Sequence, residues 1–297
     1  MKDRLRGVIT PVLTPYNDDL GIAIDLYLEH AGGCLTAGAH YLSPFGTTSE
    51  ALSNAPRERM EMLELLVSSG TVRADQLMPG TGMNSLEETL ILSRHAVEMG
   101  CAGVMTLPPF FYVTASDEGL YRYFSQLIEA IASDALKICL YHIPQNTGIG
   151  ISPTLAARLN QAFPEIVVAY KDSSGDWENT KAVIETAPGI SVFPGSESFL
   201  IDGMKIGGGG CISASCNSNV AAIRAMFDQA ALAQWDAAEA MLPRIKQHRL
   251  AIQQGGLIPA LKALKAYQTG DARWLNLRPP LENADPNLGP EVAKTLT

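Results

Sequence analysis

Eight short apolar segments recur along the 297-residue chain, and longer segments with helical periodicity separate them. Strands are expected at Val8–Leu13, Tyr41–Phe45, Leu77–Thr81, Gly103–Leu107, Ile138–Ile143, Ile166–Tyr170, Ser191–Pro194 and Cys211–Ser213. Strands that are apolar along their whole length are typical of a parallel sheet that is covered on both faces. Eight strand-then-helix units predict a closed parallel (β/α)₈ barrel, which commonly needs about 250 residues.

Signals for helix starts lie between the expected strands. Ser85 and Ser152 each precede a helical pattern, where a side-chain oxygen caps the first turn. An open doubly wound sheet is the alternative, but no Gly-x-Gly-x-x-Gly follows the first strand. Residues 220–270 are helical and rich in alanine, and they are more than one barrel helix requires. We therefore expect a single α/β domain, with a TIM barrel over residues 1–225 and a helical extension over 226–297.

Composition limits the partners and the compartment. The 31 acidic residues outnumber the 22 basic ones, and a net charge of −9 argues against nucleic-acid binding. The five cysteines form no Cys-x-x-Cys pair and the five histidines show no ligand spacing, so no metal site is expected. No apolar run reaches the roughly 20 residues of a membrane helix. These features predict a cytoplasmic protein that binds neither nucleic acid nor membrane.

Polar residues follow several of the expected strands. They occupy 46–50, 141–148 and 171–176, whereas an aromatic and proline-rich segment occupies 108–112. The C-terminal ends of all barrel strands meet on one face, where catalytic residues of this fold lie. The sequence therefore predicts an active site built from these segments.

Lys171 ends the apolar run Ile166–Tyr170, so the barrel interior should desolvate its amine. A neutral amine attacks a carbonyl carbon and forms an imine, and the protonated imine withdraws electrons from the adjacent carbon. The alternative is a structural ion pair with Asp172 or Asp176. From this segment alone, both interpretations stay open.

Tyr141 lies at the end of the strand that precedes Lys171, and Thr47 and Thr48 follow the second strand. Tyr141 should face the same opening as Lys171, where a phenol can act as a general acid–base group. Thr47 and Thr48 offer hydroxyl and backbone N–H groups to a carboxylate or a proton relay. Each also has an ordinary explanation, since Tyr141 can pack at the barrel rim and the threonines can cap a loop.

Three motifs occur together and in order along the chain: Gly-Thr-Thr-x-Glu, Tyr-x-x-Pro-x-x-Thr-Gly and Lys-Asp-Ser-Ser-Gly-Asp. From Gly7 to about Pro280 the sequence resembles the dihydrodipicolinate synthase/N-acetylneuraminate lyase family of class I pyruvate-dependent aldolases. The resemblance implies that Lys171 forms a Schiff base with pyruvate, without a separate cofactor, and that an aldehyde is the second substrate. It implies that Tyr141 exchanges protons with the intermediates.

The same resemblance implies further roles. Thr47 would link Tyr141 to Tyr112, and Tyr112 would come from a neighbouring subunit of a homotetramer arranged as a dimer of dimers. Thr48 and backbone N–H groups of its loop would hold the pyruvate carboxylate. The backbone carbonyl of Ile212 would lie near the imine.

Two positions depart from the family pattern. Ser49 stands where glycine is usual, which would narrow the pocket or add a hydrogen bond. Asn146 stands where dihydrodipicolinate synthases have an arginine for the carboxylate of the second substrate, and the loss of a guanidinium is not conservative. The Pro-x-Asn-Thr-Gly turn favours a 4-hydroxy-2-oxoglutarate aldolase-like enzyme. Dihydrodipicolinate synthase itself, a 2-oxo sugar-acid lyase or dehydratase, and a 2-oxo-acid sensor without turnover remain alternatives.

Overall fold

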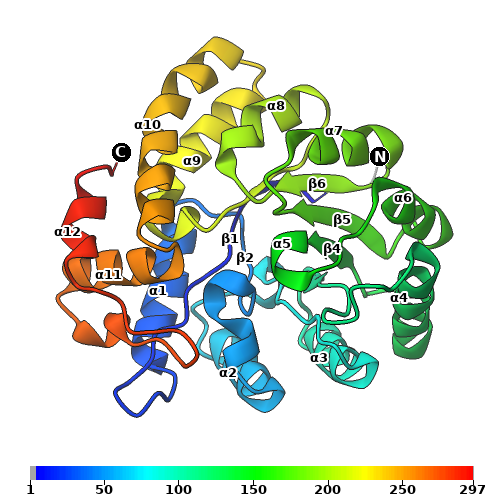
Figure 1. The fold of residues 1–297 in the computed structure, drawn as a ribbon, viewed down its shortest axis with the longest axis horizontal. Coiled ribbons are helices and arrows are strands. Elements are labelled where there is room, and N and C mark those ends of the chain that lie inside the picture. Colours follow the sequence, from blue (N-terminus) through cyan, green and yellow to red (C-terminus); the bar gives the residue numbers. More distant parts are fainter. Residues whose placement is uncertain (1–4, 297) are drawn as a thin grey trace.

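The computed structural model describes residues 5–296, in which parallel strands form a barrel surrounded by helices (Figure 1). Seven regular strands lie in this part of the chain: β1 (Gly7–Thr10), β2 (Tyr41–Leu42), β3 (Val104–Thr106), β4 (Ile138–His142), β5 (Val167–Asp172), β6 (Ser191–Pro194) and β7 (Gly210–Ile212). They pair in the orders β2-β1-β7 and β3-β4-β5-β6, and every pairing is parallel. The predicted α/β barrel fold is confirmed.

The segment Leu77–Thr81, expected as the third strand, connects the two sheets without being a regular strand. Its Met78 N–H donates to Leu42 O at 2.8 Å, and its Pro79 carbonyl accepts from Met105 N at 2.9 Å. Proline has no N–H to donate, which interrupts the regular pairing at the middle of the segment. The segment therefore occupies the position of the third strand through hydrogen bonds to both of its neighbours.

The barrel closes on the other side between β6 and β7. Gly209 N donates to Val192 O at 2.8 Å, which joins the two sheets there. Gly7 and Gly210 are paired in β1 and β7, each with φ of +137°, and a Cβ on Gly210 would lie 2.0 Å from Gly7 O. This backbone approach requires glycine, which accounts for Gly210, the last residue of the glycine run and the first of β7.

Helices surround the strands. Those of the barrel are α1 (Ile24–Thr36), α2 (Pro56–Ser68), α3 (Leu86–Glu98), α4 (Asp117–Ile131), α5 (Pro144–Thr147), α6 (Pro153–Ala162), α7 (Trp177–Thr186), α8 (Leu200–Lys205) and α9 (Cys216–Ala231). The predicted caps are confirmed, because Ser85 accepts from Glu88 N in α3 and Ser152 accepts from Leu155 N in α6. Within residues 5–296, no helix has both the length and the apolar character needed to cross a membrane.

Three further helices follow α9: α10 (Trp235–Gln254), α11 (Ile258–Thr269) and α12 (Leu288–Ala293). They lie against α9 and α1 on one side of the barrel, in orange and red in Figure 1. Leu26 of α1, Leu261 of α11 and Trp274 belong to one apolar cluster, so the extension shares a core with the first barrel unit. The expected division at residues 225 and 226 falls inside α9 and stays a prediction.

Side chains alternate between two apolar regions along β4 and β5. Tyr141 and Ala169 belong to the cluster inside the barrel, whereas Leu140 and Tyr170 belong to the cluster between strands and helices. Because successive side chains of a strand point to opposite faces, Lys171 follows Tyr170 on the inner face. The alternation therefore brings Lys171 and Tyr141 to the same side.

Candidate active site

Lys171 lies beside Tyr141 at the C-terminal ends of β5 and β4. The two residues are register partners, and Lys171 Nζ lies 4.1 Å from the centre of the Tyr141 ring. Only 3% of Lys171 is exposed. Among the ion pairs formed by residues 5–296, none includes Lys171. The amine is thus buried against an aromatic ring without a carboxylate to hold it.

The neighbouring aspartates are bound elsewhere, so the ion pair considered from the sequence does not form. Asp172 lies on the outer face of β5 and accepts hydrogen bonds from Ser174 N at 2.9 Å and Asn179 Nδ2 at 2.8 Å. Asp176 caps α7 by accepting from Glu178 N. Both carboxylates stabilise the turn after β5.

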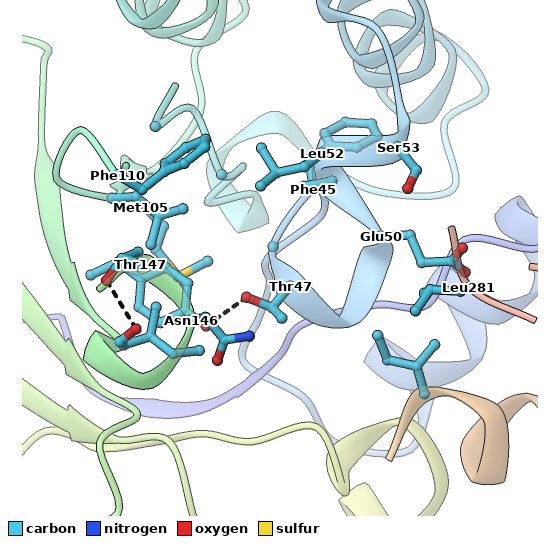
Figure 2. A pocket seen from close by; sticks show the side chains of 18 residues that line it. Phe45, Thr47, Glu50, Leu52, Ser53, Met105, Phe110, Asn146, Thr147 and Leu281 are labelled. Atoms are coloured by element: carbon cyan, nitrogen blue, oxygen red, sulfur yellow. Dashed lines mark hydrogen bonds between the residues drawn. The ribbon is translucent and has the colours of Figure 1, made fainter. Parts of the chain in front are cut away.

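Thr47 reaches Tyr141 from the loop after β2. Its Oγ1 lies 3.1 Å from the Tyr141 hydroxyl oxygen, a contact that Figure 2 shows as a dashed line. Thr47 opens a short 3₁₀ helix, Thr47–Ser49, and Glu50 ends it in the left-handed conformation with φ of 54°. Tyr141 therefore contacts Lys171 through its ring and Thr47 through its hydroxyl. A tyrosine hydroxyl held near a lysine in this way can serve as a general acid–base group.

A cavity of about 300 Å³ opens beside Thr47 and Tyr141. This volume is at the lower end of the range of small-molecule sites. Its lining residues come from several strand ends and from the extension: Phe45, Gly46, Thr47, Glu50, Ala51, Leu52, Ser53, Gly80, Gly82, Met105, Leu107, Phe110, Tyr141, Ile143, Asn146, Thr147, Ile258 and Leu281. The predicted site residues Thr47, Tyr141 and Asn146 are among them, as Figure 2 shows for Thr47 and Asn146.

Thr48 and Ser49 are buried behind the cavity and do not line it. Ser49 Oγ donates to Val12 O, and Ser49 O accepts from Thr14 Oγ1 at 2.9 Å. Of the two consequences expected from a serine here, the structure therefore shows the added hydrogen bond, which fixes the loop to the segment after β1. The N–H groups of Thr47 and Thr48 have no acceptor among the described residues.

Ile212 and Tyr112 occupy very different environments. Ile212 pairs with Ile9 inside the barrel and belongs to the same apolar cluster as Tyr141. Tyr112 lies on the loop between β3 and α4, is 63% exposed, and packs edge to face against Phe111 with ring centres 5.7 Å apart. The structure of one chain therefore places Ile212 in the barrel interior and Tyr112 on the surface, and neither lines the cavity.

A second buried lysine, paired with the cavity residue Glu50, was not foreseen from the sequence. Glu50 accepts from Lys262 Nζ and from Arg278 N, and neither the Glu50 nor the Lys262 side chain is exposed. Lys262 also donates to Asn276 O at 2.8 Å, and its Nζ lies 4.4 Å from the centre of the Tyr16 ring. Desolvation lowers the pKa of Lys262 to about 8, although Glu50 acts in the opposite direction.

The wall contributed by the extension was also missed. Ile258 at the start of α11 and Leu281 line the cavity, whereas the sequence predicted helices that pack only outside the barrel. Glu50 was visible as the last residue of the Gly-Thr-Thr-x-Glu motif. Lys262 lies 212 residues further along an ordinary helical pattern, so no local signal pointed to their contact.

Metal ligands do not cluster in the described part of the chain. Between residues 5 and 296, no group of three or more His, Cys, Asp or Glu residues is arranged to hold a metal ion. The expectation that a covalent lysine imine replaces a cofactor stays a prediction.

Known proteins with related sequences and structures point to one family. The Dihydrodipicolinate synthetase family matches residues 4–297. An uncharacterized DapA-like lyase of Chloroflexus aurantiacus is 32% identical over 93% of this chain and 91% of its own length. A 4-hydroxy-tetrahydrodipicolinate synthase of Thermus thermophilus is 36% identical over 71% of this chain and 69% of its own. The crystal structure of dihydrodipicolinate synthase from Agrobacterium tumefaciens is 30% identical, covers 97% of both chains and has a TM-score of 0.89.

Proposed function

Because the chain belongs to the dihydrodipicolinate synthetase family of lyases, we propose that it is a class I aldolase in which Lys171 forms a Schiff base with pyruvate. One observation carries this proposal. Lys171 Nζ lies 4.1 Å from the Tyr141 ring centre, and the Tyr141 hydroxyl lies 3.1 Å from Thr47 Oγ1. A buried amine without a carboxylate partner therefore packs against the ring of a tyrosine whose hydroxyl contacts Thr47, and this pair of hydroxyls can carry protons.

The reaction follows from these groups. The Lys171 amine attacks C2 of pyruvate, water leaves, and the nitrogen becomes a protonated imine. Loss of a proton from C3 gives an enamine, and C3 then bonds to the aldehyde carbon while the aldehyde oxygen takes up a proton. Water hydrolyses the imine and releases a 4-hydroxy-2-oxo acid and the free lysine. Tyr141 exchanges the protons, and Thr47 orients its hydroxyl.

The pyruvate carboxylate is assigned to the loop after β2. The N–H groups of Thr47 and Thr48, which have no acceptor among the described residues, support this assignment. Ser49 fixes the loop from behind through its bond to Val12 O. The carbonyl of Ile212 is proposed to lie near the imine, on the inner face shared with Tyr141.

The cavity supports an aldolase that cleaves or forms a 4-hydroxy-2-oxo acid, in the manner of a 4-hydroxy-2-oxoglutarate aldolase. Asn146 lines the cavity in the turn where the dihydrodipicolinate synthase pattern has an arginine. An amide does not replace the paired N–H groups of a guanidinium toward a carboxylate. A second candidate is 4-hydroxy-tetrahydrodipicolinate synthase, because the Thermus thermophilus relative carries that name.

A homotetramer built from two dimers is proposed as the active form. Tyr112 is exposed beside two other exposed apolar residues of its loop, Phe111 and Val113, so the loop is free to enter a neighbouring subunit. In that arrangement Tyr112 would complete the hydroxyl relay of Thr47 and Tyr141 in the partner. The cytoplasm is proposed as the compartment, because all five cysteines are unpaired.

Borohydride reduction in the presence of pyruvate tests the proposal. Reduction converts the imine to a stable secondary amine, and peptide mass mapping then identifies the modified lysine. We expect the adduct on Lys171. An adduct on Lys262, or no adduct on a folded protein, would show that the Schiff base has been assigned to the wrong residue or that the chain does not form one.

A further inference from the structure

The loop that carries Thr47 and Thr48 holds a backbone conformation that its own sequence does not favour. Glu50, which ends the short helix Thr47–Ser49, has φ of 54° and ψ of 40°, in the left-handed region that residues other than glycine rarely adopt. A residue in this region costs free energy, so the conformation persists only where surrounding groups hold it. The N–H groups proposed to bind the pyruvate carboxylate lie within three residues of Glu50, so their direction depends on what holds the loop.

The guanidinium of Arg278 fastens the segment that follows Glu50. Its Nη1 donates to Ser53 O at 2.9 Å and to Asn54 Oδ1 at 3.2 Å. Asn54 in turn donates through Nδ2 to Glu50 O at 2.8 Å, so a chain of hydrogen bonds runs from Arg278 to the left-handed residue. The Arg278 backbone N–H also donates to the Glu50 carboxylate, at 3.0 Å. Arg278 therefore holds the side chain of Glu50 directly and its main chain through Asn54.

The same guanidinium is fixed on two further sides. Its Nε and Nη2 donate to Leu20 O at 3.0 and 2.8 Å. Its Nη1 and Nη2 form a forked ion pair with Glu58 in the first turn of α2, at 2.9 and 2.6 Å. The guanidinium carbon lies 4.7 Å from the centre of the Tyr16 ring. Arg278 thus joins the extension to the segment after β1 and to the loop after β2, and only a planar guanidinium presents its donors in such a fork.

We propose that Arg278 is a positioning residue for pyruvate: it keeps the loop in the conformation in which the N–H groups of Thr47 and Thr48 face the carboxylate. The inference rests on the proposed Schiff-base function and adds a residue of the extension to it. Arg278 is not among the residues that line the cavity, so it acts through the loop and not by touching substrate. Because all of these contacts lie within one chain, the role requires no contact with a neighbouring subunit.

Arg273 provides a matched control on the same part of the extension. It forms ion pairs with Asp25 and Asp271, at 2.7 and 2.8 Å. Among the described contacts of its side chain, none reaches residues 46–58. Arg273→Met and Arg278→Met therefore each remove an ion-paired guanidinium from the extension, but only Arg278→Met releases the loop.

The test measures how the initial rate of borohydride trapping on Lys171 depends on pyruvate concentration, in the full-length protein and without an aldehyde. Arg278→Met should raise the half-saturating pyruvate concentration by about tenfold, the effect of weakening one or two hydrogen bonds to the carboxylate. The rate at saturating pyruvate should change little, because Lys171 and Tyr141 are untouched. Arg273→Met should keep the wild-type half-saturating concentration.

Circular dichroism establishes that each variant is folded, and Arg278→Lys decides the question if Arg278→Met is not. Arg278→Lys retains the charge but not the fork, so its half-saturating concentration should lie nearer to that of Arg278→Met than to that of the wild type; a wild-type value would overturn the inference. No adduct in the wild-type protein removes the proposed function itself. An adduct in the wild type, with an unchanged half-saturating concentration in Arg278→Met or an equal increase in Arg273→Met, overturns this inference and leaves the proposed function standing.

Discussion

Two buried lysines lie against tyrosine rings in different parts of the molecule. Lys171 Nζ is 4.1 Å from the Tyr141 ring centre inside the barrel, and Lys262 Nζ, on α11 of the extension, is 4.4 Å from the Tyr16 ring centre. Lys262 is paired with Glu50, whereas Lys171 takes part in no ion pair within residues 5–296. Burial and an aromatic neighbour therefore do not separate a structural lysine from the proposed nucleophile, but the presence of a fixed carboxylate does.

The Lys262 region explains how the extension supports the site. Glu50 ends the short helix that begins with Thr47, and its carboxylate is held by Lys262 of α11 and by the Arg278 backbone. The same lysine donates to Asn276 O. The pair thus connects the loop that carries Thr47 to the extension, and its role is to position this loop.

The largest expected effect comes from Lys171→Ala. The variant should lose turnover and the borohydride adduct entirely, because no other described amine stands beside the Tyr141–Thr47 pair. Its circular dichroism spectrum should match that of the wild type, since the substitution breaks no ion pair. Lys262→Met is the matched control and should still form the adduct on Lys171. Turnover retained by Lys171→Ala with any 2-oxo acid would show that Lys171 is not the nucleophile, and the distinction drawn between Lys171 and Lys262 would fail.

Tyr141→Phe should have the next largest effect. The phenyl ring stays beneath Lys171 while the hydroxyl and its contact with Thr47 are lost, so kcat should fall by about 10²–10⁴-fold. Imine formation should persist at a slower rate, which single-turnover trapping measures. Thr47→Val removes the same contact from the other side and should reduce kcat less. A Tyr141→Phe enzyme within a few fold of the wild type would leave the phenol without a role in proton transfer.

Breaking the buried ion pair of Glu50 and Lys262 should lower the free energy of unfolding. Glu50→Gln leaves Lys262 without its carboxylate, and a buried charge that loses its partner costs about 3–5 kcal/mol in the free energy of unfolding. The double variant Glu50→Gln/Lys262→Met should recover part of this loss, because it removes the unpaired charge as well. Guanidinium denaturation of the single and double variants measures both values. A Glu50→Gln variant as stable as the wild type would show that the pair does not hold the loop.

The sequence predicted the repeating architecture because each unit carries its own signal. Apolar runs marked the strands, and Ser85 and Ser152 marked helix starts that the structure confirms. The third strand was predicted in the right place but with regular pairing, which Pro79 does not permit. Alternation along β5 was enough to place Lys171 and Asp172 on opposite faces.

The parts of the site that were missed depend on contacts between distant segments. Lys262 meets Glu50 across 212 residues, and Leu281 reaches the cavity from beyond α11, so neither has a local pattern. Tyr112 is a different case, because the proposed position of its side chain lies in another subunit. Residues supplied by strand ends were therefore predictable, whereas residues supplied by the packing of the extension were not.

The smallest expected effect is a pH dependence of stability that comes from Lys262. Burial lowers the pKa of Lys262 to about 8, below the value near 10.4 of an unfolded chain. Between these pH values the unfolded chain binds the extra proton, so this lysine makes the free energy of unfolding rise with pH, by up to about 3 kcal/mol. The stability of the wild type relative to Lys262→Met should therefore increase from pH 8 to pH 10, as measured by denaturation at both values. A difference that stays constant between these two pH values would contradict the lowered pKa of Lys262.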